Sequence, residues 1–181
     1  MKILFLGYDE NETGLINFLK KRNHDVSWSN SKNVILNDYD LIISFGYTFI
    51  IEDKLLCSLN RPIINLHISY LPYNRGAHPN FWSHYENTPS GVSIHEIDAG
   101  IDTGPVLFQK KINFNVNETL NFSYKKLKNS IEELFKKNIE KIEKNSYEKI
   151  YPNEVGSFHK KNELPPWVSW NMTIQDVYEK R

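Results

Sequence analysis

The sequence KILFLG (Lys2–Gly7), followed after a polar turn by TGLINFLKK (Thr13–Lys21), decides the fold class. The first segment is a continuous apolar run that ends in glycine, and the second has the apolar spacing of a helix. Three more strand-like segments follow, at DVSW (25–28), DLIISFG (40–46) and PIINLH (62–67). Short strands separated by helical segments pair in parallel through right-handed crossovers. We therefore expect an α/β fold with a twisted, mostly parallel sheet of the Rossmann type and flanking helices.

The pattern changes in the second half of the chain. VSIHEID (92–98) alternates between apolar and polar residues, and VLFQKKI (106–112) follows it, so two half-exposed strands are expected. From 119 to about 146, apolar residues recur at spacings of three and four, which predicts a long amphipathic helix. We expect residues 1–181 to form one domain, with 152–181 as a loop-rich C-terminal extension and no second domain.

Composition excludes several functional classes. The 181 residues are 40% hydrophobic, which suits one domain with a proper core. Because 22 basic residues balance 22 acidic ones, bulk charge cannot attract a nucleic acid or an anionic membrane. No apolar run approaches the ~20 residues that cross a bilayer, and Met1 leads directly into a strand rather than a signal peptide, so we expect a cytoplasmic protein. Cys57, the only cysteine, is expected to be a helix residue that is buried rather than reactive.

Two glycine-punctuated motifs carry the chemistry. They are NLHISYLPYNRG (65–76) and DAGIDTG (98–104). Asn65 and His67 are two positions apart at the end of a strand, so their side chains leave on the same face. Gly7, Gly46 and Asn65 to His67 are expected at the carboxyl ends of strands, where α/β sheets bind their ligands, and 98–104 is expected as a loop between two strands.

An amide, an imidazole and a carboxylate together can perform acyl transfer to an amine. When an amine attacks a formyl carbon, an oxyanion forms and a proton must leave, so the site needs hydrogen-bond donors and a base. Asn65 and His67 can supply the donors, and Asp102 can supply the base. A carboxylate close to an imidazole also raises the pKa of the histidine, so we expect His67 to have a raised pKa.

Each of the three residues also has an ordinary structural reading. Asn65 could cap a turn, His67 could bond to the backbone at a strand end, and Asp102 could form an Asx turn. The combined pattern Asn-x-His, Pro-x-x-Arg-Gly and Gly-x-Asp-Thr-Gly is rare enough to favour the functional reading. We expect no metal, because the remaining histidines lack the spacing of a metal site, and no NAD, because the Gly-x-Gly-x-x-Gly fingerprint is missing.

The combined motifs resemble the formyltransferases that use 10-formyltetrahydrofolate as formyl donor. This family includes glycinamide ribonucleotide transformylase, methionyl-tRNA formyltransferase and the sugar-nucleotide N-formyltransferases. The resemblance runs from about residue 40 to residue 110 and implies a Rossmann-like formyltransferase fold. It also implies that Asn65 and His67 hold the formyl oxygen and that Asp102 removes the proton, directly or through a water molecule.

The resemblance also implies where the folate binds. The segment SFGYTFII (44–51) is similar to the loop whose backbone receives the pterin ring, and 98–101 is similar to the opposite wall. The cofactor-binding residues expected on this basis are Phe45, Gly46, Tyr47, Phe49, Ile50, Asp98 and Gly100.

Within the family, 68–82 and the tail motif GSFHKK (156–161) most resemble the sugar-nucleotide N-formyltransferase branch. A nucleoside diphosphate needs a local cation, and Arg75, Lys160 and Lys161 are the candidates, although a lysine pair in a loop is usually only solvated. Phe158 or Tyr73 could stack on a base. The substrate-binding residues expected on this basis are Ser69, Tyr70, Arg75, Gly76, Asn80, Phe158, His159 and Lys160.

The expected function is formyl transfer to the amine of a nucleotide-linked amino sugar, with dTDP-4-amino-4,6-dideoxyglucose as the substrate, for O-antigen and lipopolysaccharide synthesis. One alternative is glycinamide ribonucleotide transformylase, and another is a non-catalytic folate- or nucleotide-binding module. The zero net charge and the lack of a basic additional domain argue against tRNA as substrate. Exposed aromatic residues of the tail or the long helix could support a homodimer.

Overall fold

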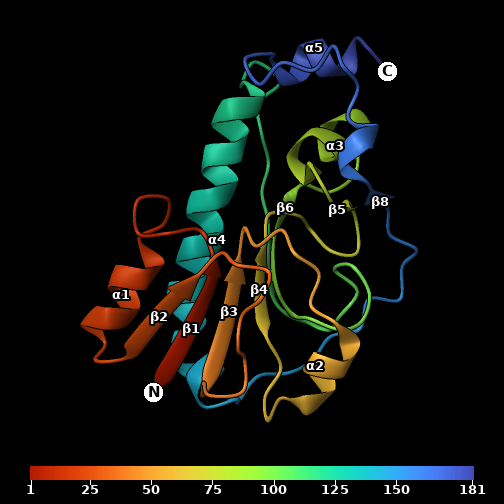
Figure 1. The fold of residues 1–181 in the computed structure, drawn as a ribbon. Helices are drawn as coiled ribbons and strands as arrows, with labels where there is room; N and C mark the ends of the chain where they lie inside the picture. The colour runs from red at the N-terminus through yellow and green to blue at the C-terminus, as the bar shows by residue number, and fades with distance from the viewer.

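The computed structural model describes residues 1–181 and contains the expected six-stranded, mostly parallel sheet. The strand order is β2-β1-β3-β4-β6-β7 (Figure 1). The first four of these strands pair in parallel, whereas β6 is antiparallel to both β4 and β7. The strands are β1 (Lys2–Gly7), β2 (Asp25–Ser29), β3 (Leu41–Phe45), β4 (Ile64–His67), β6 (Gly91–Glu96) and β7 (Val106–Lys111).

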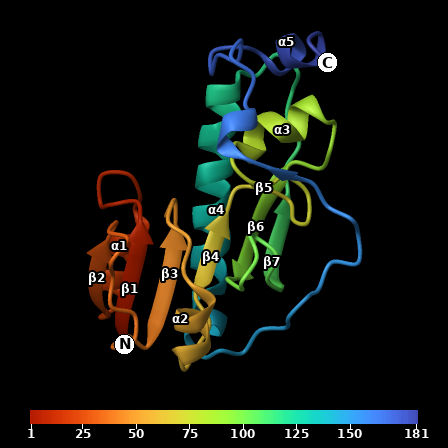
Figure 2. The same cartoon turned by 45° about the vertical axis from the view of Figure 1, so that its right-hand side comes forward.

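Helices cover both faces of this sheet. They are α1 (Leu15–Lys21), α2 (Asp53–Ser58), α3 (Pro79–Tyr85), α4 (Leu120–Glu143), α5 (Ile174–Tyr178) and the 3-10 turn η1 (Lys161–Glu163). Figure 2 shows α4 running along one face and continuing beyond the sheet toward α3 and α5. Two short strands, β5 (Arg75–Gly76) and β8 (Phe158–His159), pair in parallel and join the loop after β4 to the C-terminal tail.

Burial on both faces of the sheet explains why β1 is apolar from Ile3 to Leu6. Ile3 and Phe5 pack with α1 and α4 in one core cluster, while Leu4 and Leu6 pack in a second cluster that the α2 side of the sheet adjoins. All four side chains are almost completely buried. A parallel strand that is covered on both faces needs this continuous apolar run, so the interpretation of Lys2–Gly7 is confirmed.

The long helix α4 begins where its sequence signal places it. Thr119 is the N-cap, and its hydroxyl accepts a 3.2 Å hydrogen bond from the Phe122 amide. The apolar stripe includes Leu127, Ile131 and Phe135, which are buried against the sheet. The helix ends at Glu143, slightly earlier than the pattern suggested. No helix of the structure combines the length and the apolar character that crossing a membrane requires.

One expectation about Cys57 is confirmed and one is wrong. Cys57 lies in α2, as expected, but its side chain is exposed rather than buried. The cause is the shortness of α2, which has six residues and buries none of them completely. A helix this short covers little of the sheet, so a residue on its outer side stays in solvent.

Candidate functional site

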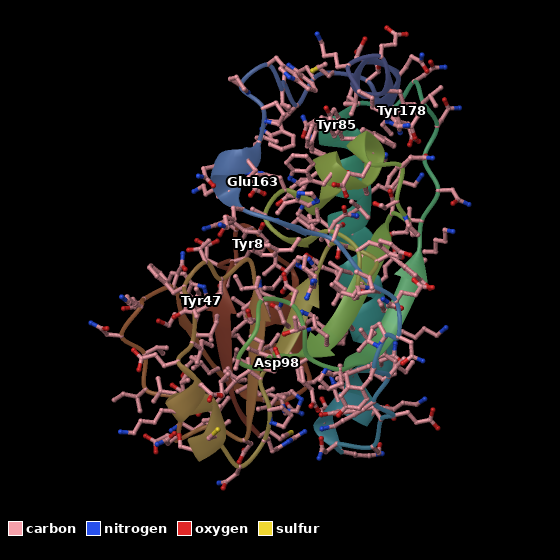
Figure 3. All side chains as sticks on the ribbon, turned by 90° about the vertical axis from the view of Figure 1, so that its right-hand side faces the viewer. Tyr8, Tyr47, Tyr85, Asp98, Glu163 and Tyr178 are labelled. Carbon is pink, nitrogen blue, oxygen red and sulfur yellow. The ribbon has the colours of Figure 1, made fainter.

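The structure contains a cavity of about 1040 Å³ where β1, β3 and β4 end. Its walls come from segments that are distant in sequence, namely the loop after β3, the end of β4, the 97–102 loop, α4 and the tail. In Figure 3, Tyr8 lies between Tyr47 and Asp98 on one side and Glu163 on the other. The cavity therefore lies between the sheet edge and the C-terminal tail, as expected for ligands of an α/β sheet.

The structure brings Asn65, His67 and Asp102 together on the wall of this cavity. Asn65 and His67 leave the same face of β4. Asn65 Nδ2 lies 3.3 Å from Asp102 Oδ1, and His67 Nε2 lies 3.5 Å from Asp102 Oδ2. All three side chains thus share one small volume that borders the cavity.

The backbone around Gly76 fixes the orientation of Asp102. The Gly76 amide donates a 2.8 Å hydrogen bond to Asp102 Oδ2. Gly76 has a φ of 85°, a conformation that side chains strongly disfavour, and a Cβ there would collide with the His159 carbonyl. The Arg-Gly of the first motif therefore supplies a backbone donor to the carboxylate of the second motif.

A second histidine, His95, belongs to the site, and the sequence interpretation missed its role. His95 Nε2 lies 3.0 Å from Asn65 Nδ2 and 3.4 Å from Asp102 Oδ1. The residue sits opposite Asn65 in the antiparallel pairing of β4 and β6 and is only 1% exposed. The alternating pattern of 92–98 predicted the strand correctly but its half-exposure wrongly, because every residue of β6 is buried. No sequence signal fixed the register that brings His95 to Asn65.

The electrostatics of the site favour an ionised carboxylate and a neutral His67. Burial opposes the ionisation of Asp102, but His67, His95 and the Gly76 amide outweigh it and hold the pKa of Asp102 well below its usual range. The expected raised pKa of His67 is wrong. Burial lowers the pKa of His67 below 6.5, and the neighbouring Asp102 only partly opposes this effect.

All seven residues expected to bind the folate line the cavity, and several expose apolar surface there. Phe49, Ile50 and Ile101 are 39%, 76% and 43% exposed. Asp98 also stabilises the 98–103 loop, because its Oδ1 accepts hydrogen bonds from the Gly100 amide at 3.1 Å and the Thr103 hydroxyl at 2.6 Å. An apolar, open wall of this kind fits a flat aromatic ring system.

The residues expected to bind the acceptor divide into two groups. Those that line the main cavity are Gly76, Asn80, Phe158, His159 and Lys160. Ser69, Tyr70 and Arg75 do not line it. Ser69 is buried, and Arg75 instead lines a separate cavity of about 210 Å³ and directs its Nε toward the Ser157 carbonyl at 3.5 Å. The cavity also has wall residues that no motif indicated, which are Tyr8, Asn121, Tyr124, Lys128 and Trp170.

Comparisons with known proteins identify relatives of this chain. The formyltransferase PseJ from Anoxybacillus kamchatkensis, crystallised with UDP-4,6-dideoxy-4-formamido-L-AltNAc and tetrahydrofolate, is 36% identical with a TM-score of 0.89. That comparison covers 98% of this chain and 97% of PseJ. The likeness therefore extends over the whole structure, including the tail.

Two further relatives match over shorter stretches. The phosphoribosylglycinamide formyltransferase of Bacillus subtilis is 35% identical over 86 residues, which are 47% of this chain and 44% of the relative. The dTDP-4-amino-4,6-dideoxyglucose formyltransferase of Mycobacterium tuberculosis is 35% identical over 81 residues, which are 42% of this chain and 32% of the relative. The matched stretch thus spans less than half of either relative.

The formyl transferase family model matches residues 20–139. This range contains Asn65, His67 and Asp102, the strands β2 to β7 and most of α4, whereas β1 lies outside it. The expected fold and the expected family are both confirmed, and the chain belongs to the formyl transferase family.

Proposed function

We propose that this protein transfers the formyl group of 10-formyltetrahydrofolate to the amine of a nucleotide-linked 4-amino-4,6-dideoxy sugar. The observation that carries the proposal is the convergence of Asn65, His67 and Asp102 on one cavity wall, with both carboxylate oxygens of Asp102 within 3.5 Å of these partners. PseJ, which was crystallised with a formylated 4-amino sugar nucleotide and tetrahydrofolate, supports this choice of reactants.

When bound, 10-formyltetrahydrofolate would supply an activated formyl group: the acceptor amine would form the new C–N bond and lose one proton, the formyl bond to N10 would break, and N10 would take up one proton to give tetrahydrofolate. The apolar wall formed by Phe49, Ile50 and Ile101 fits its ring system. The lowered pKa of Asp102 keeps this carboxylate ionised in the resting site, and Asp102 accepts the proton of the attacking amine, directly or through a water molecule.

Asn65 and His67 stabilise the negative charge that develops on the formyl oxygen. In the structure, their N–H groups face Asp102. His67 Nε2 lies 3.5 Å from both Asp102 Oδ2 and the Asn74 carbonyl, which can only accept, so Nε2 carries the hydrogen. As Asp102 takes up a proton it attracts these donors less strongly, and they become available to the oxygen at the moment when charge appears there.

The acceptor that we propose first is a UDP-linked 4-amino-4,6-dideoxy sugar with an acetamido group, because the likeness to PseJ covers nearly the whole of both chains. The second candidate is dTDP-4-amino-4,6-dideoxyglucose, which the Mycobacterium tuberculosis relative supports through its shorter match. We further propose that the reaction takes place in the cytoplasm and supplies O-antigen or lipopolysaccharide synthesis, as the resemblance to the sugar-nucleotide branch implies.

The test is a formylation assay with mass-spectrometric detection. Purified protein and 10-formyltetrahydrofolate are incubated separately with the UDP-linked sugar, with dTDP-4-amino-4,6-dideoxyglucose and with glycinamide ribonucleotide, and Asp102→Asn is the matched inactive control. We expect a formylated sugar nucleotide with the wild type only. Formylation of glycinamide ribonucleotide alone would assign the protein to the purine branch. Folate and nucleotide binding without any formylated product would make it a binding module.

A further inference from the structure

Tyr8, Tyr124 and Lys128 form a polar group on the cavity wall that no sequence motif indicated. Tyr8 follows β1, whereas Tyr124 and Lys128 are four positions apart on α4 and so share one face of that helix. The hydroxyls of Tyr8 and Tyr124 are 2.7 Å apart, and Lys128 Nζ lies 4.3 Å from the centre of the Tyr8 ring. The loop after β1 and the helix α4, which are distant in sequence, therefore contribute side chains to the same polar group.

The position of Tyr8 is rigidly defined. Its ring makes an edge contact with Phe45 at 4.8 Å between ring centres and lies against Gly46, where a Cβ would come within 2.6 Å of the ring. Burial and the Tyr124 hydroxyl raise the pKa of Tyr8 far above its ordinary value, so the phenol keeps its proton. The Tyr8 and Tyr124 hydroxyls share one hydrogen bond in which either can be the donor, so one of the two keeps a hydrogen free for a ligand.

Lys128 is a cation without a carboxylate partner. Lys126 and Lys136 of this helix pair with Glu118 and Glu132, whereas Lys125, Lys137 and Lys141 have no ion pair, and Lys128 is the only lysine of α4 that lines the cavity. Lys128 makes no ion pair, is half-buried and lines the cavity, and its only close partner is the face of the Tyr8 ring. A partly desolvated ammonium with two adjacent hydroxyls is suited to an anionic ligand group.

We propose that Lys128, with the hydroxyls of Tyr8 and Tyr124, binds the diphosphate of the acceptor nucleotide sugar. This inference rests on the proposed function and identifies the part of the site that holds the acceptor. It transfers the diphosphate-binding role from Arg75, which lies outside the main cavity, and from Lys160 and Lys161, which also line the cavity but are exposed, whereas Lys128 is half-buried.

The layout of the two walls argues for the acceptor rather than the folate as the ligand of Lys128. Tyr47, from the expected folate segment 44–51, packs against the core cluster on the α2 side of the sheet. Lys128 and Tyr124 belong to α4, whose buried residues pack in the cluster on the opposite face. Lys128 and the Tyr47 side of the folate segment thus approach the cavity from opposite faces, whereas Phe45 lies in the α4-side cluster and contacts Tyr8, so the folate and the acceptor diphosphate would occupy adjoining walls that meet at Tyr8.

Calorimetric titration of Lys128→Met tests the inference without any need for turnover. The probes are UDP, dTDP, the nucleosides uridine and thymidine, inorganic pyrophosphate and tetrahydrofolate. Lys125→Met is the matched control, because Lys125 is an exposed lysine of the same helix that does not line the cavity. We expect Lys128→Met to weaken binding of the preferred nucleoside diphosphate and of pyrophosphate about tenfold or more, since a lost charge-assisted hydrogen bond has this effect. Nucleoside and tetrahydrofolate binding should not change.

Tyr8→Phe and Tyr124→Phe should each produce a smaller loss of diphosphate affinity, and Lys128→Arg should retain most of it. Unchanged diphosphate binding by Lys128→Met would overturn the proposal. So would an equal loss in Lys125→Met, a loss confined to tetrahydrofolate, or a wild-type protein that binds none of the diphosphate probes. Intact diphosphate binding with no formylated product from any sugar nucleotide would refute the proposed function and leave this subsite standing.

Discussion

His95 accepts a hydrogen bond from Asn65 through an arrangement that fixes the tautomer of its ring. His95 Nδ1 lies 2.8 Å from the Glu96 carbonyl, which can only accept, so Nδ1 carries the hydrogen of the neutral imidazole. In this neutral tautomer His95 Nε2 is the acceptor for Asn65 Nδ2 at 3.0 Å, and its 3.4 Å contact with Asp102 Oδ1 is not a hydrogen bond. This contact orients the Asn65 amide so that its N–H groups, and not its oxygen, face Asp102.

We therefore expect His95→Phe to lower kcat while the KM values for both substrates change little. Losing a buried hydrogen bond costs about 1–3 kcal/mol, which corresponds to a drop in kcat of roughly five- to a hundredfold. Steady-state kinetics of His95→Phe, Asn65→Ala and the double variant measure the effect. If His95 acts only through Asn65, the two losses will not add. Additive losses, or a change confined to KM, would contradict this positioning role.

The roles proposed for Asp102 and His67 predict a large kinetic effect with preserved binding. Asp102→Asn and His67→Ala should each lower turnover about a hundredfold or more, because proton transfer and charge stabilisation are lost from the reacting centre. Affinity for the nucleotide and tetrahydrofolate should stay within a few-fold of the wild type in calorimetric titrations. Asp38→Asn, an exposed residue remote from the cavity, is the control. Near-normal turnover in either site variant would remove that residue from the mechanism.

The sequence predicted the layers of the fold because apolar runs report burial directly. It also predicted that Asn65, His67 and Asp102 lie together, since the two motifs have a rare composition. It did not reveal His95, because the contact with Asn65 depends on the β4–β6 register, which is a long-range property. The sequence did not indicate Lys128 for a similar reason. A lysine on an amphipathic helix is expected on the solvated face, and its contact with Tyr8 depends on the three-dimensional placement of α4 next to the end of β1. Arg75 was misplaced because sequence gives no direction to a side chain in a loop.

The environment of His67 predicts that its imidazole titrates below 6.5, because burial outweighs the attraction of Asp102. NMR titration of the histidine side-chain signals measures this pKa. The Asp102→Asn variant should lower the pKa of His67 further, since it removes the charge that opposes burial. The His24 signals, which report a residue paired with Glu143 away from the cavity, should be the same in both proteins. A His67 pKa above 6.5 in the wild type would show that the carboxylate dominates.

His84 makes stability depend on pH in a way that one substitution can isolate. Burial, followed by the charge of Arg181, lowers the pKa of His84 from 6.5 to about 4, and its Nε2 is buried without a hydrogen-bond partner. As pH falls from 6.5 toward 4, His84 binds a proton in the unfolded chain but stays neutral in the folded protein. The free energy of unfolding should therefore fall, and this residue accounts for roughly 3 kcal/mol of the loss by pH 4.

Replacing His84 with leucine removes the titrating group and leaves an apolar side chain beside Phe114, whose ring centre lies 5.4 Å from that of the histidine. Urea unfolding of His84→Leu and wild type at pH 8, 6 and 4.5 measures the difference. At pH 8 we expect stability equal to or above that of the wild type, because the variant no longer buries an unpaired nitrogen. Toward pH 4.5 the variant should lose less stability than the wild type. It should still lose some, because Asp102 and His67 also have lowered pKa values and act with the same sign. Parallel pH profiles for the two proteins would mean that His84 accepts its proton in the folded state, and that the pocket around it is more open to solvent than its 4% exposure indicates.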